Sequence, residues 1–339
     1  MRRINSPEET GSLSFNWCLN HTSFLFIFCV NLSGVGSILQ QILNGLTQGC
    51  TYSLIAIGYA MIFGALRKMN WSHSDVFAAG SMCTYFFLGL LIPNCHNLFI
   101  LLLVGLLCGA LSSAAVGWGI EKIAFRKLRF VGSSSMANSL CTIGCGFVLK
   151  EVGRLIFGAQ NQRFGNYYDW LKVYIIPGVN ITITNYQIIM MLIAVALIIV
   201  LQLFLFKTNT GRAIRAMSMN FPAAQLMGIN LDRISSLTFM ISSAISGMAG
   251  VLVGFYYRTC SPYMGALPGT KAFAAIVMGG LTSIPGAFAG GLLLGVFENI
   301  GGMLMGEKWR DGVAYFIFFL VLIVRPQGLF GGEKVEERA

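Results

Sequence analysis

The chain has 339 residues, of which 55% are hydrophobic and only 11% are charged. Ordinary soluble domains carry about 25% charged residues, so this composition excludes a water-soluble globular protein and points to a lipid environment. The net charge of +10 does not indicate nucleic-acid binding, because the basic residues lie in short loops between apolar segments, as the positive-inside rule of membrane proteins describes.

Residues 1–37 form an N-terminal extension that contains one apolar run, "FLFIFCV", within residues 19–36. The basic start of the chain resembles a signal peptide, but the acidic pair Glu8 and Glu9 and the late position of the apolar run do not. The extension therefore predicts an additional helix in preference to a cleaved signal.

Eight further windows are apolar enough to be membrane spans. They are residues 38–64, 76–92, 98–120, 131–149, 186–206, 234–257, 272–297 and 313–324. Together with the N-terminal candidate they predict an all-α, polytopic transmembrane helix bundle of about 8 to 10 crossing helices. The bundle is expected over residues 38–331, followed by a cytoplasmic tail at 332–339.

Polar residues that interrupt the first spans are candidates for a translocation pathway, because burying them unpaired in lipid is costly. Asn44, Gln48 and Tyr52 recur at four-residue spacing and share one helix face. Asn70 and His73 mark the start of the second span. Hydrogen bonding between helices is the alternative role for the first three, and a hydrogen bond at the membrane interface is the alternative for His73.

The loop over residues 207–234 predicts a short helix along the membrane face, since Pro222 suits a first helical turn and Gly228 suits a helix end. We expect Phe221, Leu226 and Met227 to be exposed on it and to contact a partner protein or lipid. The helix would comprise Pro222, Ala223, Ala224, Gln225, Leu226, Met227 and Gly228.

Glycine and proline interrupt the window 272–297, which predicts a broken helix bent near residues 283–286. Non-helical backbone at membrane depth is tolerated only inside protein or beside water, so Pro285 is a further pathway candidate, with a kinked packing helix as the alternative. Lys271 and Glu298 flank this window and are expected at the membrane interface, as is Arg310. No carboxylate falls deep in a predicted span.

Basic residues gather in alternate loops, which places these loops on one face of the membrane, the cytoplasmic one. They are Arg67, Lys68, Lys122, Arg126, Lys127, Arg129, Lys207, Arg212, Arg215, Arg233 and Arg325. The same scheme leaves Lys150, Arg154, Arg163 and Lys172 on the other face.

No catalytic or metal-binding constellation is present in the sequence. The segment "GALPGTK" at Gly265–Lys271 lacks the spacing of a phosphate-binding loop, so no ATP site of that type is expected. Neither the Cys141 to Cys145 spacing nor the three His residues form a zinc pattern. The chain is therefore not expected to be an enzyme or to hold a cofactor.

Four segments in the expected order resemble the permease subunits of branched-chain amino-acid ABC importers. They are "LQQILNGLTQGCTYSLIAIGYAMIFG" at 39–64, "MNWSHSDVFAAG" at 69–80, "GTKAFAAIVMGGLTSIPGAFAGGLLLG" at 269–295 and "RPQGLFG" at 325–331. In addition, "FPAAQLMGIN" resembles the family's coupling loop, which docks in the ATPase. Residues 1–37 have no counterpart, and Trp71, Ser72 and Ser74 depart from the usual residues.

The resemblance implies a permease with no covalent chemistry of its own, in the inner (plasma) membrane of a bacterium or archaeon. It further implies a second, related permease subunit, two cytosolic ATPase subunits that bind ATP and Mg, and an extracytoplasmic solute-binding protein. Urea or short amides are the alternative cargo. A stand-alone channel or secondary transporter is the alternative class, although an ion-coupled carrier is expected to bury acidic residues in its spans.

Overall fold

The structure is a computed structural model that describes residues 11–91, 97–130, 134–164, 172–176 and 181–330. The predicted tail at 332–339 and residues 1–10 lie outside the described part. The first helix runs without a break across residues 37 and 38. The proposed division into extension, bundle and tail remains a prediction.

The described chain is almost wholly helical, so the predicted all-α bundle is confirmed. The first helices are α1 (Gly11–Leu66), α2 (His73–Leu91), α3 (Leu98–Ile120), the π-helical turn η1 (Glu121–Phe125), α4 (Arg126–Phe130) and α5 (Ser135–Phe157). They are followed by α6 (Asn185–Lys207), α7 (Asn209–Met219), α8 (Phe221–Leu226) and α9 (Leu231–Tyr257). The last are α10 (Ala266–Gly279), α11 (Ile284–Met305), the 3-10 turn η2 (Glu307–Trp309) and α12 (Arg310–Val324).

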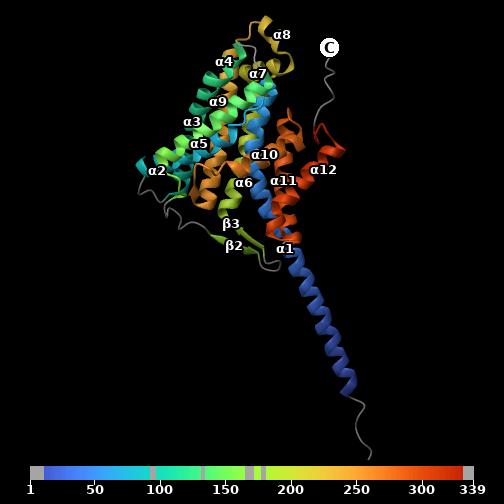
Figure 1. The fold of residues 1–339 in the computed structure, drawn as a ribbon. Coiled ribbons are helices and arrows are strands. Elements are labelled where there is room, and N and C mark those ends of the chain that lie inside the picture. Colours follow the sequence, from blue (N-terminus) through green and yellow to red (C-terminus); the bar gives the residue numbers. More distant parts are fainter. Residues whose placement is uncertain (1–10, 92–96, 131–133, 165–171, 177–180, 331–339) are drawn as a thin grey trace, which may run out of the picture.

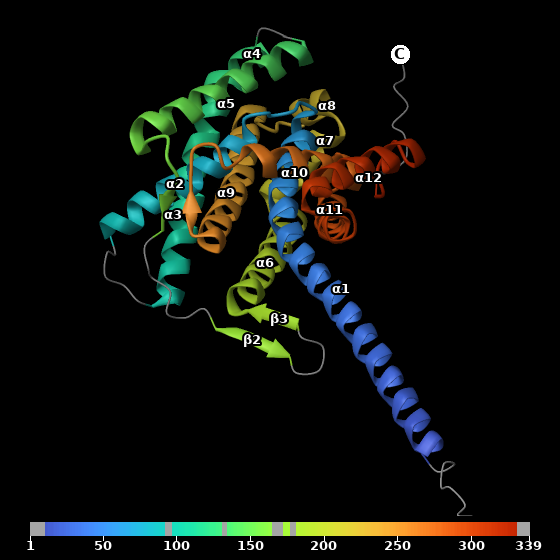
Figure 2. The ribbon, with the colours of Figure 1, turned by 60° about the horizontal axis from the view of Figure 1, so that its bottom comes forward.

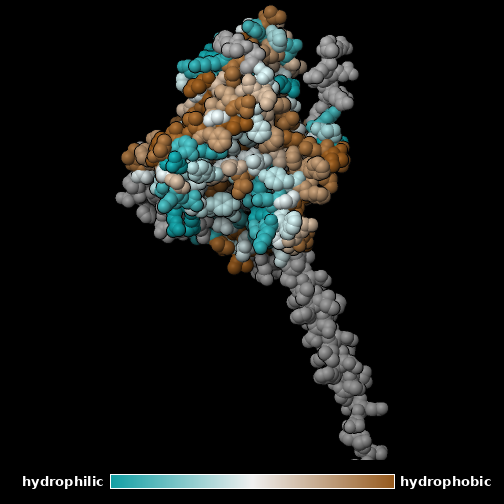
Figure 3. Space-filling model, viewed as in Figure 1, coloured by the Kyte–Doolittle hydropathy of each residue, from teal (hydrophilic) through white to brown (hydrophobic). Residues whose placement is uncertain are grey.

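Each predicted window coincides with one of these helices or, for the broken window, with two. Five stretches of the described chain are long and apolar enough to cross a membrane. They are Gly36–Leu66, Phe99–Arg129, Asn185–Lys207, Leu231–Tyr257 and Ile284–Met305. Apolar residues cover much of the flanks of the bundle, while hydrophilic residues collect toward its lower end (Figure 3).

The helix α1 is the axis of the bundle: α9, α10 and α11 pack along its C-terminal half, and its N-terminal part projects beyond them (Figures 1 and 2). Its contact with α11 is backbone to backbone. A Cβ added at Gly49 would lie 2.8 Å from the Cα of Leu292, and one added at Gly291 would lie 2.4 Å from Oγ of Ser53. Glycines therefore set the approach of these two helices, as expected inside a membrane.

The broken helix is confirmed, and the break lies slightly before the predicted bend. The helix α10 ends at Gly279, and Gly280 takes a positive φ of 113° that favours glycine. Ser283 then caps α11 by accepting a hydrogen bond from the Gly286 N–H, which leaves Pro285 in the first turn of the new helix. Proline lacks an N–H, but a first turn has no intrahelical use for that donor.

Short strands occupy the end of the bundle from which α1 projects, and the sequence did not predict them. The strands β2 (Val173–Ile176) and β3 (Ile181–Thr184) form an antiparallel pair, and β1 (Gln162–Arg163) pairs with β4 (Thr259–Cys260). Figure 1 places β2 and β3 at this end, whereas α4, α7 and α8 lie at the other, which we call the basic end. The basic end is rich in the Arg and Lys that were expected to share one face.

Candidate functional site

The short helix α8 forms where the sequence predicted one. Asn220 caps it by accepting a hydrogen bond from the Ala223 N–H, and Pro222 occupies its first turn. After the helix ends, Gly228 has a φ of 81°, and an added Cβ would meet nothing within 4 Å. Glycine is thus needed here for backbone conformation and not for space.

Apolar side chains protrude from α8 at the tip of the basic end (Figure 1). Leu226 is 88% exposed and Met227 is 82% exposed, while Ala224 is buried and fixes the helix to the bundle. Phe221 corrects the prediction, because it is half-buried against the core and is not presented to a partner. The exposed patch therefore consists of Leu226 and Met227, with Met219 beside them at 86% exposure.

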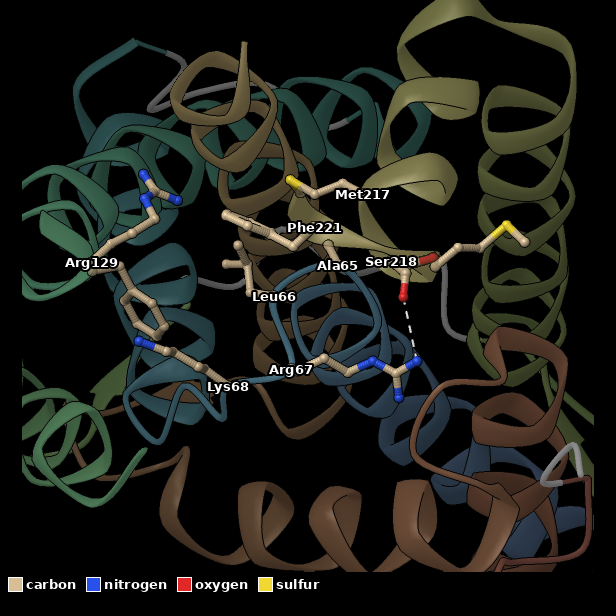
Figure 4. Close-up of a pocket in the computed structure, with 10 residues that line it drawn as sticks. Ala65, Leu66, Arg67, Lys68, Arg129, Met217, Ser218 and Phe221 are labelled. Atoms are coloured by element: carbon tan, nitrogen blue, oxygen red, sulfur yellow. Dashed lines mark hydrogen bonds between the residues drawn. The ribbon is translucent and has the colours of Figure 1, made fainter. Parts of the chain in front are cut away.

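A pocket of about 330 Å³ lies beneath this patch, between the end of α1 and the α7–α8 segment (Figure 4). Leu66, Met217 and Phe221 form its apolar side, and Arg67 and Lys68 stand at its rim. Arg67 adopts a positive φ of 53°, unusual for a residue with a side chain, and its Nη2 donates to the Ser218 carbonyl oxygen at 3.3 Å. This bond ties the end of α1 to the segment that carries α8.

A buried carboxylate holds the basic end together. Glu121 is fully buried, and Arg129 donates from Nη2 to its Oε1 at 3.1 Å and to Oδ1 of Asp232 at 2.5 Å. Oε2 of Glu121 accepts from the hydroxyl of Ser236 at 2.6 Å and lies 3.6 Å from Nη2 of Arg126. The network links η1 and α4 to the start of α9.

A polar cavity of about 200 Å³ opens beside α1 toward the other end of the bundle, about five helical turns from Leu66. Its lining consists of Asn44, Thr47, Gln48, Thr51, Met190, Val253, Tyr256, Tyr257, Asn299 and Arg310. Two of the predicted pathway residues, Asn44 and Gln48, thus line one cavity. Asn44 accepts from Gln187 Nε2 at 3.3 Å, and Gln48 accepts from Asn299 Nδ2 at 3.1 Å.

An ion network joins this cavity to the broken helix. Glu298, which is 1% exposed, accepts at Oε1 from Lys271 Nζ and from Arg310 Nε, both at 2.9 Å. Lys271 also donates to Asp311 at 2.6 Å, and Arg310 donates from Nη1 to Glu307 at 2.7 Å. Five ionic side chains from α10, α11, η2 and α12 therefore neutralise one another at this site.

This network corrects the expectation that Lys271, Glu298 and Arg310 sit at the membrane interface, since the first two are buried and the third turns inward to the cavity. It also corrects the absence of buried carboxylates, because Glu298 lies inside α11. Asp75 of α2 is likewise buried and lies 3.2 Å from Lys150 Nζ. Each buried carboxylate has a cationic partner distant in sequence, and that pairing makes its burial tolerable.

The other predicted pathway residues lie elsewhere. Tyr52 is buried beside the ion network, with Lys271 Nζ at 5.6 Å from its ring centroid. Asn70 and His73 are buried where α2 begins and do not line the polar cavity; the His73 ring packs 4.8 Å from that of Tyr59. Pro285 lies in the first turn of α11, whereas the cavity residue of α11, Asn299, lies almost four turns later.

Sequence reasoning missed Asn299 and Arg310 as cavity residues. Both were visible as polar interruptions next to apolar windows, but Arg310 was attributed to the membrane surface. In the described part of the chain, His, Cys, Asp and Glu form no group of three or more that suits a metal ion.

Comparison with known proteins identifies relatives along most of the chain. The family model described as "Branched-chain amino acid transport system / permease component" matches residues 41–322. The high-affinity branched-chain amino acid transport system permease protein LivH of Escherichia coli (strain K12) is 34% identical over 302 residues, which is 88% of this chain and 97% of that protein.

LivH of Salmonella typhimurium shows the same 34% identity over 302 residues, with the same shares of both chains. BraD, the corresponding permease protein of Pseudomonas aeruginosa, is 35% identical over 301 residues, 88% of this chain and 97% of that protein. The family match and these identities agree with the apolar helices that make this a multi-pass membrane protein. The chain therefore belongs to the permease component family of branched-chain amino acid transport systems.

Proposed function

We propose that the chain is a membrane-spanning subunit of an ATP-driven importer that carries branched-chain amino acids across the plasma membrane of a bacterium or archaeon. The names of its relatives support this cargo in preference to urea or short amides. The chain pairs with a second, related permease subunit and receives its cargo from an extracytoplasmic binding protein. ATP and Mg are bound by two cytosolic ATPase subunits and not by this chain.

The observation that carries the proposal is the pair of unlike sites along α1. The exposed apolar patch of Leu226 and Met227 stands at the basic end, which the positive-inside rule makes cytoplasmic. A patch of this kind on a short, otherwise weakly charged helix requires a protein to cover it. The ATPase subunits are the occupants, and α8 is the coupling helix through which they act.

The polar cavity supplies the second half of the proposal. Amide and guanidinium groups are expensive at membrane depth unless they face water or a ligand. Asn44, Gln48, Asn299 and Arg310 gather on one side of α1 between α6 and α12. We assign this surface to the translocation pathway, facing the second permease subunit. Binding of ATP in the partners shifts the pathway between its two orientations to the extent that it favours one of them.

The test is reconstitution of this chain with its partner permease, ATPases and binding protein in proteoliposomes. Uptake of labelled leucine, isoleucine and valine that requires ATP supports the proposal, and uptake of urea alone, or uptake without ATPase subunits, contradicts it. Leu226→Asp is expected to remove most of the co-purifying ATPase by placing a charge in the patch. Leu304→Asp is the control, because Leu304 is similarly exposed, at 74%, but lies at the opposite end.

A further inference from the structure

The polar cavity has the size of a single small metabolite. Its volume of about 200 Å³ is below the roughly 300 Å³ at which pockets for drug-sized ligands begin, and several times the roughly 30 Å³ that one water molecule occupies. Its lining combines amides and hydroxyls with two apolar side chains, Met190 and Val253. A ligand that fits this lining is small, carries polar groups at one end and has an apolar portion.

Arg310 gives the cavity its charge, since it is the one ionic side chain among the described residues that line it. Its Nε and Nη1 groups donate to the carboxylates of Glu298 and Glu307, on the side away from the amides. Its Nη2 group instead donates to two neutral amide oxygens, Oε1 of Gln48 and Oδ1 of Asn299, the latter at 3.0 Å.

The neutral partners of Nη2 are exchangeable for a stronger one. A hydrogen bond from a guanidinium to a carboxylate is roughly twice as strong as one between neutral groups. A carboxylate that enters the cavity therefore displaces Gln48 and Asn299 from Nη2, and both amides also carry N–H donors that can turn toward it. Glu298 and Glu307 need not move, so the ion network stays intact during this exchange.

The remaining lining suits the rest of an amino acid. The hydroxyl groups of Thr51 and Tyr257 and the oxygen of Asn44 are acceptors for an ammonium group. Met190 and Val253 accommodate an aliphatic side chain. We propose that the polar cavity binds one apolar α-amino acid in transit, with its carboxylate on Nη2 of Arg310 in place of Gln48 and Asn299. This proposal rests on the import function proposed above.

The experiment measures protection of a cysteine placed in the cavity. Thr51→Cys is introduced into the purified complete transporter without its binding protein, so that the binding protein does not select the ligand. Modification by a small neutral methanethiosulfonate is followed by peptide mass spectrometry, and the same protein with Thr51 intact reports labelling of native cysteines such as the neighbouring Cys50. Leucine is compared with isoamylamine, which is leucine without its carboxylate.

We expect leucine to slow the modification at least threefold and isoamylamine to leave it unchanged. Equal protection by both compounds, or by neither, overturns the proposal. Asn299→Asp places a permanent carboxylate beside Nη2 with almost no change of shape and is expected to abolish protection by leucine. Asn97→Asp is the control for the charge change, because Asn97 is an exposed helix cap, where Asp serves equally well.

Retained protection in Asn299→Asp also overturns the proposal, since the site on Arg310 would then be unnecessary. Failure of this inference differs from failure of the proposed function. If wild-type proteoliposomes import leucine with ATP but leucine does not protect Cys at position 51, only the cavity assignment is wrong. If they import no branched-chain amino acid at all, the import function itself is wrong.

Discussion

The two ends of α1 expose and bury their polar groups in opposite ways. At the basic end, α8 presents Leu226 and Met227 to the surroundings, and the arginines of the Glu121 network remain partly exposed. Toward the opposite end, Lys271 and Glu298 are buried and neutralised within the chain. The first region is therefore suited to a changing partner, whereas the second is a fixed scaffold beside a cavity.

The largest effect is expected from Glu298→Ala, which removes the shared partner of Lys271 and Arg310. Breaking a buried ion pair from one side typically costs about 3–5 kcal/mol, a large part of the stability of most proteins. We expect a strong loss of monodisperse protein in detergent and a lower midpoint of thermal unfolding. Glu307→Ala is the matched control: Glu307 also pairs with Arg310 but is 77% exposed at its side chain, so its loss is expected to cost less than about 1 kcal/mol. Equal losses would erase the distinction between scaffold and surface.

Glu121→Ala is expected to have the next largest effect, about 2 kcal/mol. Its loss leaves two arginines unpaired, but these are partly exposed at the basic end and can be hydrated. Asp232→Ala removes the other carboxylate from Arg129 and serves as the control, since the side chain of Asp232 is 37% exposed. Thermal unfolding of both variants measures the difference. A larger effect of Asp232→Ala would mean that the exposed pair, and not the buried one, holds this end together.

Gly228→Asp is expected to disturb partner binding more than stability. The φ of 81° costs a residue with a side chain about 1 kcal/mol, although Asp tolerates this region better than most. The added charge lies next to the apolar patch of α8. We expect normal membrane insertion but severalfold less co-purified ATPase, measured by quantitative mass spectrometry. Unchanged recovery together with unchanged leucine uptake would count against docking at α8.

The smallest effect is expected from Arg67→Gly. Glycine relieves the positive φ of 53° but removes the hydrogen bond to the Ser218 carbonyl, and these contributions are of similar size and opposite sign. We expect a change in unfolding free energy within about 0.5 kcal/mol. A loss above about 2 kcal/mol would show that the link between α1 and the α7–α8 segment is a structural support. Such a result would make the two ends more alike.

Features that depend on local chemistry were predictable from the sequence. The apolar windows, the cap and first turn of α8, and the break in the window 272–297 each follow from residues that are close together in the chain. Proline, glycine and apolar runs act on their own neighbourhood, so a reading along the chain detects them. Four-residue glycine spacing likewise predicted close helix packing, which Gly291 and Gly295 make with α1.

Features that depend on distant partners were not predictable in this way. Glu298 meets Lys271 and Arg310 only after α10, α11 and α12 have packed, so each charge alone resembled a residue at the membrane surface. The same holds for Asn299, whose cavity role depends on Gln48, 251 positions earlier. Phe221 was expected to be exposed because its neighbours are, but the curvature of the chain into α8 turns it toward Met217 and the end of α1.

The glycine contact between α1 and α11 limits how the protein can move. Where two backbones touch without intervening side chains, there is no compliant layer that rotamer changes can adjust. Gly45, Gly49, Gly291 and Gly295 therefore make the two helices a single rigid rod. A rearrangement that opens one side of the membrane and closes the other must tilt this rod as a unit, so its sliding surfaces are expected along α6 and α9, where longer side chains separate the backbones.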